Sequence, residues 1–564
     1  MKGSYPRRLV PICLAALVLA GTADPALAQE VPDAGTLLRE QPRLVRPPVE
    51  PSSPPTLETP SVQAEESGPR VQVSAIRVTG ATLIPAEELA AQLSPLVGGE
   101  HSFAELQGGA LTLIAYYVQK GYLARVVLPP QEIKDGIVEY RVVEGARGDL
   151  KIDNKGQRIQ TERVRRFIDA RLSPGDPVDL KAMGDAVNIL NQQPGAQVSA
   201  TLARGKGEHD VDILVEALDR PLLSYEAGVN NHGSKGSGVV QGMAALTVAN
   251  PTGRFDALSL LVNASEGAVF GRAEYGLAVG DRGLRVGLNV SGLTYEVVQS
   301  DLASLDASGS AVAAGLTASY PLAMRTVFGL GLTGSLSGQH FEDHAAGAKV
   351  GERNVGVASV GLVGYRVQPD GPFEGLQSFG VDLIGGNVGR NRADSGGGES
   401  RTEGGFAKLA WDVGLTRTLA SDWLLEGAAH GQFASRNLDS SQQFSLGGPG
   451  GVRGYPLAEG AGDDGWIASG TLSRDLGPSL RIGGFFDVGG IRVEHSPLAT
   501  GPSPNHYTLS AAGASLDWRI TPQAVLNATV AAPVGDNPGA QADGTNSDGS
   551  GRDTRLWLSL HAVF

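Results

Sequence analysis

The chain has little cysteine, few aromatic residues and no long apolar segment after residue 30. Cys13 is its only cysteine, so a disulfide scaffold and a zinc site built from thiolates are both excluded. A membrane-spanning helix needs about 20 consecutive apolar residues. Nothing comparable follows residue 30, so the mature chain is not a helical membrane protein.

The chain also lacks concentrated positive charge and the common motifs of enzymes. Its formal net charge is −14, which argues against nucleic acid as a partner. It contains no G-x-S-x-G, no phosphate-binding loop and no H-E-x-x-H, and its nine histidines are scattered. Residues 205–207, Gly-Lys-Gly, are interpreted as a hairpin turn. We therefore expect no enzymatic activity, no cofactor and no metal.

The first residues have the features of a secretory signal. A basic start precedes an apolar stretch over residues 9–20, and a small-residue cleavage site follows at 26–28. We predict a signal peptide over residues 1–28, which contains Cys13. The mature chain then has no cysteine, which suits the bacterial periplasm or outer membrane.

Residues 29–70 are proline-rich and polar, and we interpret them as a linker. Residues 36–41 within it could form a short helix. An isolated helix of this length is unstable, so it would need a surface to dock against. A nascent helix in an unstructured tail is the alternative that stays open.

Residues 71–220 alternate strand and helix signals twice over. The pattern in residues 71–146 predicts the order β-α-α-β-β, with one helix that begins at a capping box of Ser102 and Glu105 and ends at Gly121. The same order repeats over residues 147–220. We predict two small α+β domains in tandem.

After residue 220 the sequence alternates apolar and polar residues, as strands do. Soluble sandwiches also alternate. The length of this zone, its hydrophilic polar face and the terminal aromatic Phe564 favour a transmembrane antiparallel β-barrel over residues 221–564. The 344 residues left after residue 220 of 564 suit about 16 strands, with about 14 or 18 left open. Small residues on the polar face predict an open pore.

Several short motifs are spread over these zones. They are Gly121-Tyr122, Leu128-Pro129, Gln131, Asp135-Gly136, Val143-Glu144-Gly145, N-Q-Q-P-G at 191–195 and N-P-T-G at 250–253. With them the chain resembles the TpsB transporters of two-partner secretion, the FhaC and ShlB type related to BamA. The resemblance covers the whole mature chain, as a tail, two periplasmic POTRA domains and an outer-membrane barrel.

The most specific motif lies in a glycine-rich loop over residues 447–465. Its residues are Val452, Arg453, Gly454 and Tyr455, and a second motif, F-x-D, is formed by Phe485 and Asp487. The resemblance implies that the loop folds into the lumen and that Arg453 pairs with Asp487. A guanidinium in a narrow lumen favours a bidentate carboxylate. By pattern alone, Arg453 could also lie on a solvated surface loop, with Asp487 merely lining the barrel.

The resemblance also implies a function. It is that of an outer-membrane transporter that passes an unfolded exoprotein, an adhesin or haemolysin with an N-terminal secretion domain, to the cell surface without nucleotide hydrolysis. The other implied partners are outer-membrane lipid, periplasmic chaperones and the barrel assembly machinery. The helix that contains Leu37 and Leu38 is a candidate plug of the lumen, and Phe564 is the C-terminal barrel signal.

Two alternatives stay open. An insertase of the BamA kind would fold other barrels into the membrane, but that class usually has more POTRA domains than the two that fit residues 71–220. A passive diffusion pore would need neither the two domains nor the pairing of Arg453 with Asp487.

Overall fold

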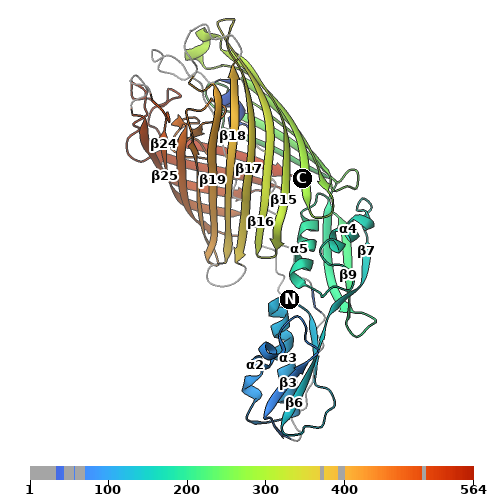
Figure 1. Cartoon of the computed structure of the whole chain (residues 1–564). Helices are drawn as coiled ribbons and strands as arrows, with labels where there is room; N and C mark the ends of the chain where they lie inside the picture. The colour runs from blue at the N-terminus through green and yellow to red at the C-terminus, as the bar shows by residue number, and fades with distance from the viewer. Residues whose placement is uncertain (1–32, 43–55, 58–69, 369–373, 391–400, 498–503) are drawn as a thin grey trace.

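The computed structural model shows two small domains joined to one end of a closed β-barrel (Figure 1). The predicted signal peptide, residues 1–28, and most of the predicted linker lie outside the described residues. The structure describes residues 33–42, 56–57, 70–368, 374–390, 401–497 and 504–564.

The first domain has the predicted β-α-α-β-β order around a three-stranded sheet, β3-β6-β5. Helix α3 begins at the predicted capping box of Ser102 and Glu105 and ends at Gly121, whose φ of 96° favours glycine. The elements are β2 (Val71–Gln72), β3 (Ala75–Thr79), α2 (Ala86–Gln92), η1 (Ser94–Leu96), β4 (Glu100–His101), α3 (Phe103–Lys120), β5 (Ala124–Val127) and β6 (Ile137–Glu144).

Motif residues of the first domain shape its turns. Asp135 and Gly136 both have positive φ, 58° and 73°, in the turn that leads into β6. The side-chain amide of Gln131 pairs with the backbone of Glu139 on β6: its Nε2 donates to the carbonyl oxygen at 2.9 Å, and its Oε1 accepts from the N–H at 2.7 Å. The side chain of Gln131 therefore hydrogen-bonds to β6 much as a neighbouring strand would. Gln131, Asp135 and Gly136 thus contribute to the fold of the first domain.

Glu144, at the end of β6, joins three parts of the first domain. Its carboxylate accepts hydrogen bonds from the backbone N–H groups of Thr82 and Leu83, both at 2.8 Å, and from the hydroxyl of buried Tyr117 at 2.8 Å. Burial raises the pKa of Glu144, but the hydrogen bonds from Thr82, Leu83 and Tyr117 outweigh it and hold the pKa below its usual range. The ionised form is thus the one that the fold selects.

Replacing Glu144 with glutamine is expected to lower the free energy of unfolding of the first domain by about 1–2 kcal/mol at neutral pH, because hydrogen bonds to a charged acceptor are the strong ones. A depressed folded-state pKa stabilises the fold above the unfolded pKa, and this stability is lost as pH falls through the folded value. The difference between wild type and variant should therefore shrink on acidification. Hydrogen exchange of the first domain within the full-length protein measures it, and a difference that is independent of pH would contradict this account.

The second domain repeats the order with a four-stranded sheet, β1-β8-β9-β7. Its outer strand β1 comes from the N-terminal segment and pairs parallel with β8, Thr56 opposite Thr201 and Leu57 opposite Leu202. Helices α4 and α5 cover the sheet with apolar residues. The elements are β1 (Thr56–Leu57), β7 (Ala146–Asn154), α4 (Thr161–Asp169), α5 (Leu180–Asn191), β8 (Ala196–Arg204) and β9 (Asp210–Asp219).

Two of the turn motifs join the second domain to the barrel. Gln193 of N-Q-Q-P-G accepts a hydrogen bond from Nη1 of Arg285 on the barrel wall at 2.9 Å. The same Nη1 donates to the carbonyl oxygen of Phe255 at 2.8 Å, just after the N-P-T-G turn at 250–253. The fully buried ring of Phe255 packs edge-on against Phe167 of α4, with centroids 5.7 Å apart. The second domain is thereby held against the periplasmic rim of the barrel.

The barrel is a closed antiparallel meander of 16 strands, as the sequence predicted. It closes where the last strand, β27, pairs with the first, β10. The strands are β10 (Leu223–Asn230), β11 (Gln241–Ala249), β12 (Ala257–Ala264), β13 (Ala268–Val279), β14 (Leu284–Glu296), β15 (Ser308–Arg325), β16 (Phe328–Ala345), β17 (Ala348–Gln368), β18 (Gly375–Arg390), β19 (Gly404–Ala420), β20 (Trp423–Ala434), β23 (Asp464–Asp475), β24 (Leu480–Arg492), β25 (His506–Arg519), β26 (Ala524–Pro533) and β27 (Arg555–Val563). A short helix, η2 (Ser300–Leu305), lies between β14 and β15.

The two faces of the barrel wall follow the alternation of the sequence. On β14, Val286, Leu288 and Val290 are exposed on the outer face, whereas Arg285 is buried on the inner one. The outer residues suit a lipid environment. Among the described residues, no helix is both long enough and apolar enough to cross a membrane.

The barrel interior differs from the open pore that small lumen-facing residues predicted. Helix α1 (Ala34–Glu40) and the loop 435–463 between β20 and β23 lie inside it. The small residues of the wall leave the volume that these two segments occupy. Local alternation reports only the size of side chains on the wall, and it cannot report that distant segments return to fill the space.

Candidate functional site

Loop 435–463, which contains most of the glycine-rich segment 447–465, folds back into the lumen from the extracellular end of the barrel. Two short strands inside it, β21 (Phe444–Ser445) and β22 (Ala461–Gly462), pair with each other and narrow its base. At its tip Val452 and Tyr455 are fully buried. They pack in one apolar cluster with inward-facing residues of the wall, including Ile467, Ile491, Leu509 and Ala511.

Arg453, at the tip of the loop, is held by Asp487 on β24. Its Nη2 lies 2.7 Å from Oδ1 of Asp487, its Nε lies 2.8 Å from Oδ2, and its backbone N–H donates to Oδ2 at 3.1 Å. Asp487 is fully buried, and the guanidinium also stacks over the ring of Phe485 at 3.4 Å from its centroid. The geometry is bidentate, so it fixes the direction of the arginine as well as its charge. The structure thus brings together the three residues that the two motifs suggested.

Gly454 allows the loop to lie flat against the wall. A β-carbon at this position would lie 2.8 Å from Cβ of Ala511 on β25 and 2.9 Å from the backbone nitrogen of Pro533 on β26. A side chain here would therefore push the loop off the wall. The glycine is required by close approach, since its φ is not in the left-handed region.

Helix α1 lies in the lumen on the side away from the loop tip, and Figure 1 shows it in blue near the upper end of the barrel. It begins at the N-cap Asp33, whose side chain accepts from the N–H of Thr36 at 2.7 Å, and it covers residues 34–40 rather than the predicted 36–41. Leu37 is 1% exposed, and Leu38 is partly buried in the same cluster. The cluster includes wall residues of eight strands and one loop residue, namely Leu261, Phe270, Leu293, Tyr295, Ala311, Phe341, Val355, Val388, Phe406 and Leu438.

Arg353 on β17 binds the start of helix α1, the candidate plug helix. The sequence did not predict this residue. Its guanidinium lies 2.5 Å from Asp33 at the start of α1, 2.7 Å from Asp343 on β16 and 3.1 Å from Asp439 in the loop. Asp343 in turn accepts a hydrogen bond from the N–H of Ala34 at 2.8 Å. One buried arginine therefore links the plug, the barrel wall and the lumen loop.

The partners of Arg353 are far apart in the sequence, at positions 33, 343 and 439. No motif marks them, and the only local signal is that charged residues occur at inward-facing positions of strands. An exposed charge would look the same in the sequence. The charges of this cluster can be paired only once the topology of the barrel is known.

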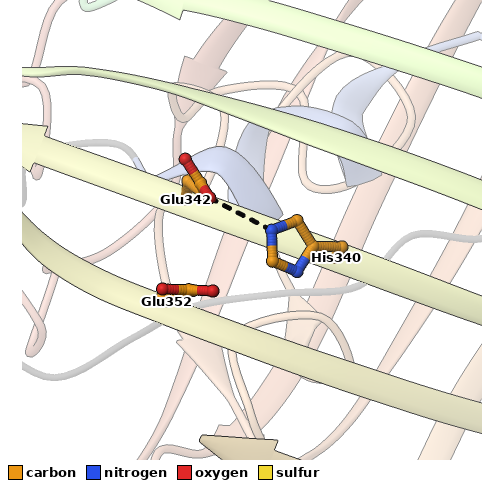
Figure 2. A group of neighbouring side chains, drawn as sticks. All are labelled: His340, Glu342 and Glu352. Atoms are coloured by element: carbon orange, nitrogen blue, oxygen red, sulfur yellow. Dashed lines mark hydrogen bonds and ion pairs between the residues drawn. The ribbon is translucent and has the colours of Figure 1, made fainter. Parts of the chain in front are cut away.

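A separate cluster of potential metal ligands lies on the neighbouring strands β16 and β17. It consists of His340, Glu342 and Glu352, which Figure 2 shows side by side. Their ligand atoms lie within 4.8 Å of one another. The ammonium of Lys349 lies 3.0 Å from Glu342 and 3.1 Å from Glu352, and the Nδ1 of His340 lies 2.9 Å from the side chain of Asn354. Lys349 already balances both carboxylates, so the arrangement is that of an ion-pair network on the hairpin.

Comparison with known proteins identifies the architecture. The model of the family described as haemolysin secretion/activation protein ShlB/FhaC/HecB matches residues 207–520, which is more than half of the chain. The chain belongs to the ShlB/FhaC/HecB family. A second model, the ShlB-type POTRA domain, matches residues 71–145.

One curated relative of this ShlB/FhaC/HecB protein spans nearly its whole length, and another spans about two thirds of it. The heme/hemopexin transporter protein HuxB of Haemophilus influenzae (strain 86-028NP) is 24% identical over 556 residues, which cover 94% of this chain and 95% of HuxB. The outer membrane transporter CdiB of Dickeya dadantii (strain 3937) is 23% identical over 408 residues, 69% of each chain.

Two solved structures share its fold. CdiB from Escherichia coli superposes with a TM-score of 0.68 at 20% identity, over 92% of this chain and 94% of CdiB. BamA from Haemophilus ducreyi lacking POTRA domains 1–3 gives a TM-score of 0.50 at 15% identity, over 87% of this chain and all of that one.

The ShlB/FhaC/HecB protein is an outer-membrane transporter that secretes a partner protein, with its POTRA domains in the periplasm. The proteins of this family are transporters. The insertase alternative is not favoured, because the family model is that of secretion/activation proteins and the named relatives are transporters. The predictions of a TpsB-type transporter, of its location and of its POTRA-and-barrel fold are confirmed.

Proposed function

We propose that this transporter captures one large exported protein in the periplasm and passes it, unfolded, through the lumen after the plug helix has left. The observation that supports this is that one N-terminal segment occupies two points of the route. Helix α1 lies in the lumen, and strand β1 lies on the edge of β8 in the second POTRA domain.

The edge of β8 is where an extended substrate segment would pair. Without β1, β8 would be the outermost strand of its sheet and would present free backbone donors and acceptors. Adding a strand to such an edge is a common way of binding an extended peptide. A substrate that pairs with β8 must displace β1, and so competes with the same segment that carries the plug.

The pair of Arg453 and Asp487 is proposed to hold the lumen loop in its resting position. Asp487 is fully buried and the side chain of Arg453 is 17% exposed, so their attraction is stronger than at a surface, and separating them would leave the buried carboxylate without its partner. A passing substrate needs the space that the loop fills. We propose that the loop moves as one unit, with Gly454 sliding over the wall.

The remaining parts of the cycle follow from the compartment. The periplasm offers no nucleotide, so we propose that folding of the substrate outside the cell drives export. We also propose that the chain catalyses no reaction, since its sequence lacks the common motifs of enzymes. The substrate is proposed to carry an N-terminal secretion domain and to be kept unfolded by periplasmic chaperones. Residues 1–28 are proposed to direct export of the transporter itself, and the barrel assembly machinery to insert it into outer-membrane lipid.

Replacing both Thr56 and Leu57 with proline is expected to raise the affinity of the transporter for an extended substrate segment about tenfold. Proline has no N–H, so β1 can no longer pair fully with β8. A loss of about 1.4 kcal/mol, within the range of one or two net backbone hydrogen bonds, corresponds to a tenfold change. Fluorescence anisotropy of a labelled peptide from the secretion domain, with the full-length protein in detergent, measures the affinity.

The matched control replaces Thr56 and Leu57 with alanine, which keeps both backbone N–H groups. It should bind the peptide as the wild type does. Equal affinity of the proline and alanine variants would show that β1 does not compete with substrate at this edge.

Deleting the gene tests the function as a whole. One large exoprotein should disappear from the medium while other outer-membrane proteins assemble normally. A general loss of outer-membrane proteins would contradict the proposal and support an insertase instead. Of the two relatives named above only HuxB has a substrate in its name, so we propose no narrower class than a large exported protein. A gene for such a protein next to this one would identify the partner.

A further inference from the structure

Trp557, on the last strand β27, makes a second attachment to the lumen loop. Its side chain is 7% exposed, and its indole Nε1–H donates to the backbone carbonyl oxygen of Arg453 at 2.8 Å. The donor and acceptor are 104 residues apart in sequence. Arg453 is therefore held at both ends, by Asp487 through its guanidinium and by Trp557 through its carbonyl.

The backbone on either side of Trp557 is clamped to the first strand of the barrel. Asn231, just after β10, donates from Nδ2 to the carbonyl oxygen of Leu556 at 2.8 Å and accepts at Oδ1 from the N–H of Leu558 at 2.7 Å. The ring of His232 packs edge-on against the indole, with centroids 5.8 Å apart. Strands β10 and β27 pair over residues 226–230 and 559–563, and the hydrogen bonds of Asn231 extend this contact beyond the paired residues.

The loop tip consequently lies across the last four strands of the barrel. Its guanidinium is bound on β24, the glycine that follows touches β25 and β26, and its carbonyl is bound on β27. Strand β27 is the one that closes the barrel against β10. A displacement of the loop must therefore break a contact with the closing strand.

We infer that Trp557 is a positioning residue for the lumen loop: it orients the backbone at Arg453 toward Asp487 and ties the loop to the strand that closes the barrel. A carbonyl oxygen that loses its donor in a buried site is left unsatisfied, which weakens the resting position. The consequence for secretion rests on the proposed function of the loop, whereas the position of the loop does not.

The test measures how often the loop leaves the wall. Cys13 is the only cysteine of the chain and lies in the predicted signal peptide, so Val452→Cys provides a single thiol at a fully buried site. Trp557→Phe keeps a ring but removes the N–H, and it should raise the rate of maleimide labelling roughly two- to tenfold, the range of one net hydrogen bond. Trp518→Phe, the same change at a tryptophan that is 46% exposed, is the matched control and should leave the rate unchanged.

A second labelling site separates a local from a general effect. Val355→Cys lies beside the plug, 1% exposed, and should be labelled equally slowly with and without Trp557→Phe. Asn231→Ala, which removes the clamp but leaves the indole in place, should raise labelling at Val452→Cys by a smaller factor. Heat-modifiable migration confirms that each variant is a folded barrel.

The outcomes distinguish this inference from the proposed function. Faster labelling at position 452 with normal secretion supports the attachment by Trp557 and contradicts a role of the loop in transport. Unchanged labelling at position 452 in both the Trp557→Phe and Asn231→Ala proteins overturns the inference, whatever happens to secretion. A parallel rise at positions 452 and 355 also overturns it, because the barrel as a whole would then have loosened.

Discussion

Replacing Arg453 with alanine is expected to abolish secretion while leaving a folded, heat-modifiable barrel in the outer membrane. The change leaves the carboxylate of Asp487 buried without its cation, and breaking a buried pair in this way costs about 3–5 kcal/mol. That is a shift of more than about 100-fold in the population of the docked loop. The barrel itself should survive, because its strands are joined by backbone hydrogen bonds that the loop does not make. The measurement is the amount of the partner exoprotein in the medium against the amount retained in the cells.

Two further variants make this result specific. Arg474→Ala removes an exposed arginine of β23 that pairs with Asp422 near the periplasmic rim, and it should secrete normally, because surface ion pairs contribute little. Arg453→Lys keeps the charge but loses the bidentate fork, so its secretion should be reduced. Normal secretion by Arg453→Ala would refute the proposed role of the loop, and loss of the barrel from the membrane would show that the pair serves folding instead.

Replacing Arg353 with alanine is expected to release the plug helix and open the lumen. Three carboxylates, Asp33, Asp343 and Asp439, would then face one another without a cation, so the start of α1 would be repelled from the wall that now holds it. The purified protein in planar bilayers should change from a mostly closed channel to one with a steady, large conductance. Cells should become sensitive to a large hydrophilic antibiotic that the intact outer membrane excludes.

The control for this variant lies on the same strand. Arg366→Ala removes an exposed arginine of β17 near its periplasmic end, away from the plug, and should leave the conductance unchanged. Asp33→Asn should open the channel less often than Arg353→Ala, since it removes one partner of the arginine and leaves two. A closed channel in the Arg353→Ala protein would mean that the apolar contacts of Leu37 hold the plug without the ion cluster.

The cluster around Arg353 and the pair of Arg453 with Asp487 share one segment of the chain. Loop 435–463 contributes Asp439 to the cluster around Arg353 and Arg453 to the pair with Asp487. A movement of this loop would therefore act on the plug and on the wall at the same time. Conductance of the Arg453→Ala protein reports this coupling: intermediate opening is expected, because Asp439 then sits on a loop that is no longer anchored at its tip.

The parts of the fold that sequence could predict depend on neighbouring residues. The capping box at Ser102 and the left-handed Gly121 bound α3 because both ends of a helix are determined within a few residues. The outward-facing valines and leucines of β14 follow from a period of two, which every strand shares. Helix α1 starts at residue 34, two residues before the predicted start, because Asp33 caps it.

The candidate site was predictable only where a motif carried it. Arg453 and Asp487 are 34 residues apart, and their contact was suggested by resemblance to a family and not by any local rule. Arg353, Trp557 and Asn231 gave no comparable signal, because an arginine or tryptophan on a strand, or an asparagine just after one, looks the same whether or not a distant segment meets it.

The sequence by itself determined that the chain is an exported β-barrel with two α+β domains, since short-range alternation, turn residues and capping decide each element where it stands. The tertiary structure decided that a loop and a helix fill the lumen of the barrel, so that it is not an open pore. The physical reason is that a closed sheet brings side chains from distant strands to face one lumen. A buried charge there needs partners, and those of Arg353 include Asp33, which is 320 residues away in the sequence.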